Sequence, residues 1–207
     1  MKLKLIFPFL AASICLTSCE RVTAQSFDFK KYEEYRAKIG SAYGTAEGLL
    51  PPISELGEYE RVQFAYKQFT YLFFLDFKSE GISLFLDYNQ ENYALAKSYV
   101  EETYTFIDDE YVEAHHHYQF PVASFEYKEY SFRIAPTPHT NSSTGEIYYM
   151  CKSFVMIGYN ESINSVAYLY FYDFDLDYLY DEDDKSAGDI NAVMPELIKK
   201  SFYWRKK

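Results

Sequence analysis

The fold is decided by the stretch Phe69-Thr70-Tyr71-Leu72-Phe73-Phe74-Leu75-Asp76-Phe77, which is followed by Lys78-Ser79-Glu80-Gly81 and by an apolar run from Ile82 to Tyr88. Residues 69–77 are too rich in aromatic side chains to favour a helix, and such residues are typical of strands. The polar residues 78–81 end in glycine, which is typical of a turn. We therefore expect a β-hairpin in which residues 69–77 pair with residues 82–88.

Four more strands are expected on the C-terminal side of this hairpin, at residues 125–127, 130–134, 147–157 and 166–178. The dipeptide Lys128-Glu129 is the expected turn of the first pair, and residues 136–145 are expected to form a loop. Residues 158–165 would join the second pair. Because each strand follows its neighbour through a short connection, the pattern favours an antiparallel sheet.

Three segments have the apolar spacing of amphipathic helices. The first begins after Ser26, which can cap it, and ends at Gly40. The second follows Asn89, a good cap, and the third covers residues 190–202, where Pro195 predicts two pieces or a late start. The apolar residues that define the three segments are Phe29, Tyr32 and Ile39, then Tyr93, Ala96, Val100 and Tyr104, and finally Ile190, Val193, Leu197, Ile198 and Phe202.

This order of elements predicts an α+β fold. We expect a single antiparallel sheet of about five or six strands with two or three helices packed mainly on one face. Parallel βαβ units would need a helix between most strands, and the pattern offers none there. Residues 26–207 are expected to form one domain, in which residues 41–57, with Pro51-Pro52, are an irregular connection.

The composition describes an acidic chain that is rich in aromatic residues. Its 207 residues include 23 Tyr and 18 Phe, and the formal net charge is −11, with a pI near 4.8. Nucleic acid is not an expected partner, because phosphate backbones bind to basic surfaces. Only 8 glycines are present, which argues against a glycine-rich cofactor fold, and no cofactor is expected.

The first nineteen residues have the order of an export signal. Lys2 and Lys4 precede an apolar run from Leu5 to Leu16, which has the length of a signal-peptide core and is too short to span a bilayer as a helix. The run ends in Leu16-Thr17-Ser18-Cys19. An aliphatic residue, two small residues and a cysteine in this order resemble the lipobox of bacterial lipoproteins.

The resemblance, which covers residues 1–19 only, implies cleavage before Cys19 and attachment of a diacylglycerol to its sulfur. Residues 1–18 would be the signal peptide and residues 19–25 a lipidated tether, so that lipid anchors the chain to the outer face of the cell membrane. Beyond the signal, the chain resembles uncharacterised small lipoproteins of Gram-positive bacteria, without a named family. The alternative is an ordinary secretory signal that is cut after Ala24.

Cleavage before Cys19 would also change the charge and the thiols of the chain. Loss of Lys2 and Lys4 would take the formal charge from −11 to −13, so that lipid rather than surface charge would hold the chain at the membrane. Cys151 would be the remaining thiol without a lipid, so no internal disulfide is expected. We expect it to be a small buried core residue.

Closely spaced carboxylates follow the last expected strand, with Asp173, Asp175 and Asp177 at every second position. They resemble the opening of a calcium loop, since Ca²⁺ prefers clustered oxygen ligands. An EF-hand would need glycine where Tyr178 stands. The alternative is that the strand leaves the core here and runs into a solvated acidic loop at residues 173–184.

The histidines are a second candidate for a metal site. In an extended segment His115 and His117 would point the same way, and His139 is the remaining histidine outside the run His115-His116-His117. A His-x-His pair and a distant His can hold catalytic zinc. The alternative is a histidine-rich surface loop. Sequence motifs of nucleophilic catalysis are not recognisable, so no catalytic residue is expected.

Tyrosines are the candidates for ligand binding. Most aromatic residues of a domain of this size must fill its core. Tyr168, Tyr170, Tyr172 and Tyr178 would share one face of the last strand. Were this row partly exposed, it would offer flat apolar rings with hydroxyl groups, which are typical of binding surfaces.

We therefore expect a membrane-anchored extracytoplasmic lipoprotein that binds an envelope protein or glycan and is not an enzyme. The rival hypothesis is a metal-binding protein or metal-dependent hydrolase built on the His115–His117 run or on the acids of residues 173–184. A ligand-capture lipoprotein that delivers to a transporter is a third hypothesis, although the chain is short for a two-lobed receptor.

Overall fold

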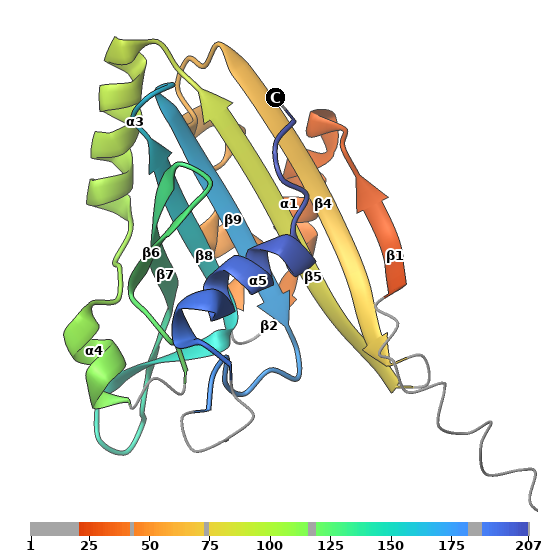
Figure 1. The fold of residues 1–207 in the computed structure, drawn as a ribbon, viewed down its shortest axis with the longest axis vertical. Coiled ribbons are helices and arrows are strands. Elements are labelled where there is room, and N and C mark those ends of the chain that lie inside the picture. Colours follow the sequence, from red (N-terminus) through yellow and green to blue (C-terminus); the bar gives the residue numbers. More distant parts are fainter. Residues whose placement is uncertain (1–20, 42–43, 73–74, 116–118, 182–187, 207) are drawn as a thin grey trace, which may run out of the picture.

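The computed structural model describes residues 21–41, 44–72, 75–115, 119–181 and 188–206. In this part of the chain, a twisted antiparallel sheet of seven strands is covered by helices (Figure 1). The α+β class and the single antiparallel main sheet are confirmed. The described residues contain seven strands in this sheet and five α-helices, which is more of each than expected.

The strand order of the sheet is β1-β4-β5-β9-β8-β7-β6, and every neighbouring pair is antiparallel. The strands are β1 (Arg21–Ser26), β4 (Arg61–Leu72), β5 (Leu75–Asp87), β6 (Ser124–Tyr127), β7 (Tyr130–Thr140), β8 (Ile147–Asn160) and β9 (Ser165–Asp173). Consecutive strands pair directly in β4–β5, β6–β7, β7–β8 and β8–β9. Four of the six pairings are therefore local, as the short connections predicted, whereas β1–β4 and β5–β9 join strands that do not follow one another in the sheet.

The hairpin of β4 and β5 is present, but its turn was predicted at the wrong place. The two strands pair from Arg61↔Asp87 to Leu72↔Leu75, so the chain reverses after Leu72 rather than at residues 78–81. Those residues lie inside β5. A Cβ atom on Gly81 would overlap the carbonyl oxygen of Ser201, and the Phe202 ring would lie 3.2 Å from it. The glycine therefore permits close approach of a helix and does not form a turn.

The N-terminal segment also differs from the expectation. Residues 21–25, predicted as part of a tether, form β1 together with Ser26, and this strand pairs with β4 from Arg21↔Thr70 to Ser26↔Tyr66. Asp28 rather than Ser26 caps the first helical turn, because its carboxylate accepts a hydrogen bond from the backbone of Lys30. The 3₁₀ turn η1 (Phe29–Lys31) then continues into α1 (Tyr32–Lys38).

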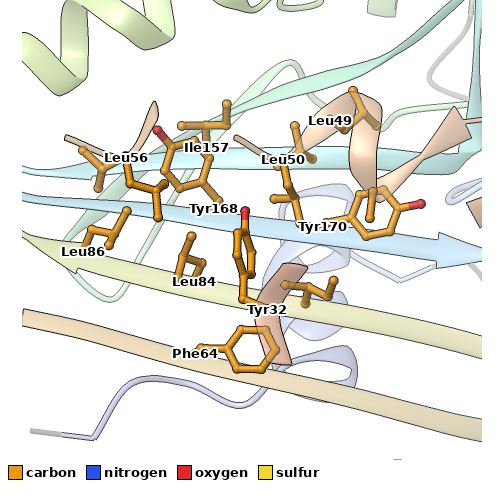
Figure 2. Close-up of a cluster of buried hydrophobic side chains, with 14 of the residues drawn as sticks. Tyr32, Leu49, Leu50, Leu56, Phe64, Leu84, Leu86, Ile157, Tyr168 and Tyr170 are labelled. Atoms are coloured by element: carbon orange, nitrogen blue, oxygen red, sulfur yellow. The ribbon is translucent and has the colours of Figure 1, made fainter. Parts of the chain in front are cut away.

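The connection expected to be irregular is a compact excursion that covers one face of the sheet. It contains β2 (Gly40–Ser41), β3 (Gly44–Thr45), α2 (Ala46–Leu49) and the 3₁₀ turn η2 (Ile53–Glu55), with β2 and β3 forming a separate two-stranded pair. Its apolar residues pack with the sheet residues shown in Figure 2. This layer also includes α3 (Gln90–Thr103), whose cap Asn89 and buried residues Tyr93 and Val100 agree with the predicted helix.

The opposite face is covered as well, so the expectation of helices mainly on one face was wrong. It carries α4 (Asp109–Ala114) and α5 (Ile190–Ser201), whose buried residues Val112, Met194 and Ile198 join a second core cluster. Figure 1 shows α5 in front of the sheet and α1 behind it. Pro195 lies within α5, which is one continuous helix rather than two pieces.

The ends of two strands differ from the prediction. β9 is buried at all nine positions and ends at Asp173, five residues before the predicted end at Tyr178. β7 runs through Pro136 and Pro138 to Thr140, with a register shift between the two prolines, where a loop was expected. Prolines lack the backbone donor that a regular ladder needs, and a bulge accommodates them.

Candidate functional site

The C-terminal segment after α5 lies along the sheet and places the single tryptophan of the chain among aromatic side chains. The ring of Trp204 packs against those of Phe85, Tyr127, Tyr130 and Phe132, with centroid distances of 5.1, 4.9, 5.6 and 6.3 Å. All four contacts are edge-to-face, which is a favourable geometry for aromatic pairs. Trp204 is therefore fixed in position by three strands, β5, β6 and β7.

The next residue, Arg205, ties the segment to the end of β5. Its two terminal nitrogens donate to the two carboxylate oxygens of Asp87 at 2.7 Å, and Nη1 also donates to the hydroxyl groups of Tyr130 (2.7 Å) and Ser165 (3.0 Å). The Tyr130 hydroxyl donates to Ser165 Oγ at 2.9 Å, and Ser165 donates to the carbonyl of Leu86 at 3.0 Å. The bidentate pair of Arg205 and Asp87 fixes the plane of the guanidinium group.

The charges of this pair stabilise each other. Burial disfavours the charged carboxylate of Asp87, but the hydrogen bonds and the positive charge of Arg205 outweigh that effect and hold the pKa of Asp87 below the ordinary value. Hydrogen bonding to Asp87 raises the pKa of Arg205 further, although burial opposes it. Both groups are therefore ionised at neutral pH, and their paired hydrogen bonds hold the guanidinium group of Arg205 in place.

A pocket of about 660 Å³ opens beside Trp204 and Arg205. We call it the Trp204 pocket, and it is lined by Lys128, Glu129, Tyr130, Asn160, Ile163, Trp204 and Arg205. Its volume lies within the range of small-molecule sites, and it combines apolar surface with a few polar groups, as such sites do. Lys128 Nζ lies 5.1 Å from the Trp204 ring centroid, which is a cation–π distance.

The rim of the Trp204 pocket is made by two strand turns. Lys128 and Glu129 connect β6 and β7 and have φ values of 47° and 69°, and Asn164, between β8 and β9, has a φ of 48°. Among the described residues, these are the three non-glycine positions with positive φ. Positive φ at both central residues is what a two-residue type I′ hairpin turn requires, so the β6–β7 connection is a tight hairpin turn. The turn predicted at Lys128-Glu129 is confirmed.

A second pocket, of about 470 Å³, lies on the other side of the C-terminal segment and shares Trp204 and Arg205 with the first. It is lined in part by Phe27, which is 55% exposed and packs on Tyr203 with ring centroids 4.9 Å apart. Residues 203–206 thus separate two hollows on the same face. The aromatic segment is the shared wall of both.

The predicted tyrosine row is largely buried. Tyr168, Tyr170 and Tyr172 are 2%, 0% and 8% exposed and belong to the core beneath α1 and α2 (Figure 2). Their expected exposure was wrong, because the excursion at residues 41–57 covers this face. Burial raises the pKa of Tyr168 and of Tyr170. Tyr178 lies beyond the end of β9 and is 50% exposed.

The candidate metal ligands occupy separate local environments. His115 stacks on the ring of Tyr111, with centroids 3.9 Å apart, and its Nδ1 lies 2.8 Å from the Tyr111 carbonyl oxygen. His139 stacks on Tyr148 with ring centroids 5.4 Å apart. His117 lies outside the described residues. Among the described ones, no group of three or more His, Cys, Asp or Glu side chains could hold a metal ion.

The acidic residues after β9 are engaged with neighbouring groups. Asp173 accepts hydrogen bonds from the Ser79 hydroxyl and, at 2.9 Å, from the backbone of Asp175. Asp177 pairs with Lys152 at 3.0 Å. Asp175 and Asp177 are exposed, as expected of a strand that leaves the core.

Cys19 and Cys151 are the two cysteines that the predicted cleavage would leave in the chain. Cys19, the predicted lipidation site, lies outside the described residues. Cys151 is fully buried in β8, and burial raises the pKa of its thiol to about 12. It is therefore protonated at neutral pH and has the character of the predicted core residue.

Comparison with known proteins gave no relative. No protein-family model, curated protein or solved structure matched the chain. In the described part of the chain, no helix has the length and apolar character needed to cross a membrane.

The sequence pattern did not point to Trp204 or Arg205, because they follow the last helix and belong to no periodic stretch. A signal was nonetheless present. The single tryptophan of the chain stands next to an arginine, and both residue types are enriched at binding surfaces.

Proposed function

We propose that this protein is an exported lipoprotein, held at the outer face of the membrane by an acylated Cys19, and that it acts there as a non-catalytic binding module. The signal pattern of residues 1–19 supports the address, and the Trp204 pocket supports the binding role. The observation that carries the proposal is a rigid aromatic surface beside a rim of polar side chains.

The chemistry of the Trp204 pocket favours a small polar ligand with one apolar face, such as a sugar ring of an envelope glycan. Trp204 offers apolar area that its four aromatic contacts hold in place. Glu129 and Lys128, which are both exposed, supply a carboxylate and an ammonium group for hydroxyl partners. An envelope protein that inserts a side chain is the other class of ligand.

The hydrogen bonds of Arg205 and Tyr130, which line the Trp204 pocket, favour binding over catalysis. The guanidinium of Arg205 is committed to Asp87 and two hydroxyl groups, and the Tyr130 hydroxyl is committed to Ser165. A general base needs free access to the proton that it removes. These groups instead serve to hold Trp204 and its neighbours in one geometry.

The single tryptophan makes the test direct. We expect solubilised fragments of bacterial envelope glycan to change the emission of Trp204 in a saturable way. The double variant Lys128→Asn/Glu129→Asn, in which asparagine tolerates the positive φ of both positions, should weaken this binding by at least about tenfold, because each lost interaction contributes about 1 kcal/mol or more. Fluorescence titration gives both affinities.

The matched control is Lys199→Ala, an exposed lysine on α5 that pairs with Glu196 and lies outside the Trp204 pocket. It should bind as the wild-type chain does. Saturable binding that the double variant leaves unchanged would place the ligand elsewhere, and no response to any glycan or protein fraction of the envelope would refute the binding role. Acylation is tested separately, by the mass of the N-terminal peptide.

A further inference from the structure

The edge strand β1 is shorter than the strand with which it pairs. β1 ends where Ser26 pairs with Tyr66, whereas β4 extends beyond this pair to Arg61. Within the described residues, positions 61–65 therefore have β5 as their only strand partner, and Figure 1 shows β1 beside only part of β4. Backbone groups of a strand point alternately to its two edges, so this stretch presents donors and acceptors that no second strand of the described chain pairs with.

The second pocket, of about 470 Å³, lies at this open edge, and we call it the strand-edge pocket. Its lining includes the consecutive residues Val62 to Ala65 of β4. Side chains of consecutive strand residues point to opposite faces of a sheet. Phe64 faces the core beneath α1, while the amide group of Gln63 bonds to the backbone of Lys206 in the C-terminal segment. A pocket lined by residues of both kinds follows the backbone of β4.

Aromatic rings from both faces of the sheet line the strand-edge pocket. Phe29 packs against Phe64 on the face of α1, with ring centroids 6.4 Å apart, and Tyr203 lies on the face of the C-terminal segment. The ring of Phe27 packs on Tyr203 and is nevertheless more than half exposed. An exposed ring beside a hollow offers apolar surface to a ligand. The pocket therefore combines unpaired strand backbone with places for apolar side chains.

The charged residues among the described ones that line the strand-edge pocket are Arg205 and Lys206. Arg205 is paired with Asp87, whereas Lys206 is exposed. Arg61 adjoins Lys206, because its guanidinium group lies 3.4 Å from the Lys206 carbonyl oxygen. The charged lining is thus cationic in a chain of formal charge −11. A bound segment with carboxylate groups would meet complementary charge here.

From these observations we propose that residues 61–65 of β4 bind an extended, acidic peptide segment of another protein, which adds a strand to this edge of the sheet. The segment would continue the row that β1 occupies beside β4, and its apolar side chains would enter the strand-edge pocket. In this mode of recognition, backbone hydrogen bonds supply the affinity and the side-chain pockets supply the sequence preference. The site differs from the Trp204 pocket in ligand and does not depend on the glycan-binding role proposed above.

Selection from a displayed library of random octapeptides on the purified full chain tests this site. We expect selected peptides to alternate apolar and polar residues and to carry Asp or Glu. They should slow hydrogen–deuterium exchange of the amides of residues 61–65, because hydrogen-bonded amides are protected. N-methylation of alternate residues along one edge of such a peptide should abolish binding, because a methylated amide cannot donate to a ladder.

The variant Phe27→Ala/Lys206→Glu should weaken peptide binding by about tenfold or more, because it removes an aromatic wall and reverses a charge. The matched control is Phe174→Ala/Lys199→Glu, which changes an aromatic residue of 57% exposure and an exposed lysine, both outside the strand-edge pocket. This control should bind the peptides as the wild-type chain does. Both variants should keep the circular dichroism spectrum of the wild-type chain.

The outcomes separate this site from the Trp204 pocket, which the glycan titration tests on its own. Failure to select any peptide would refute the proposal, as would peptides that bind both variants equally or that protect only amides outside residues 61–65. Protection of residues 61–65 in the protein alone, together with a dimer mass by light scattering, would assign this edge to a second copy of the chain and would also refute the peptide partner.

Discussion

Arg205 joins two parts of the chain that are far apart in sequence. It binds Asp87 through both carboxylate oxygens, and the exposed fractions of the two side chains are 12% and 18%. A pair with this little solvent contact is screened far less than a surface ion pair. Removal of one partner would leave a charge in a partly desolvated site.

Asp87→Asn should lower the free energy of unfolding at pH 7 by about 2–3 kcal/mol, because Arg205 would lose its counter-charge. The pKa of Asp87 is depressed in the folded state, so its stabilising effect is present above the ordinary pKa near 3.9 and is lost as the pH falls through the folded-state value. Urea unfolding at pH 7, 5 and 3 should show the difference shrinking below pH 4.

The control for this prediction is Glu161→Gln, which removes an exposed partner of Lys97. It should change the free energy of unfolding by less than about 1 kcal/mol. A difference between wild type and Asp87→Asn that stays constant from pH 7 to pH 3 would contradict the assigned role of the carboxylate.

Individual residues were predictable where their role is local. Asn89 caps α3 as expected, because a cap acts on the backbone of the next three residues. Tyr168 and Tyr170 were assigned to the correct face of β9, but their burial depends on residues more than a hundred positions earlier in the chain. The role of Trp204 depends on its packing against residues of β5, β6 and β7, which no local sequence pattern reveals.

At the scale of elements, close packing of α5 on β5 decides where glycine is needed. The carbonyl oxygen of Ser201 and the ring of Phe202 occupy the space above Gly81. β4 and β5 pair as far as Leu72↔Leu75, so the chain reverses within the run of residues 69–77. Gly81, which was predicted as a turn residue, lies inside β5. The sequence pattern identified the hairpin correctly and its register wrongly, because glycine has both uses.

Gly81→Ala should destabilise the protein by about 1–3 kcal/mol, because the added methyl group has to displace the backbone of α5. Thermal and urea unfolding monitored by circular dichroism would measure the loss. Gly188→Ala is the matched control, since a Cβ there has no atom within 4 Å and the change should stay within about 0.5 kcal/mol. Equal stability of the two variants would contradict the close approach.

For the whole molecule, the main unforeseen feature is that both faces of the sheet are covered. The excursion at residues 41–57 lacks any periodic pattern, so its role as a cover could not be predicted, although the fold class could. Its consequence is that many tyrosines lie in the core. Burial raises the pKa of several of them, among them Tyr32, Tyr88, Tyr104, Tyr168 and Tyr170.

Alkaline titration should reveal this burial. Unfolded tyrosines ionise near pH 10, whereas the buried ones resist ionisation, so the stability that they contribute is present below pH 10 and is lost as the pH rises above it. Tyrosinate absorbance should therefore rise in two stages, with the second coinciding with loss of the circular dichroism signal. In concentrated guanidinium chloride all 23 tyrosines should titrate in one stage. A single stage in the native protein would contradict the arrangement.

The position of β1 has a mechanical consequence. An anchor on Cys19 would pull on the first residue of an edge strand whose hydrogen bonds to β4 run perpendicular to the strand. The Trp204 pocket lies near Asp87, the last residue of β5, which is about 40 Å from Leu75 at the first residue of this strand at 3.3 Å per residue. A load between ligand and membrane would thus act along the strands, and the hydrogen bonds of β1 would share it in shear instead of breaking one after another.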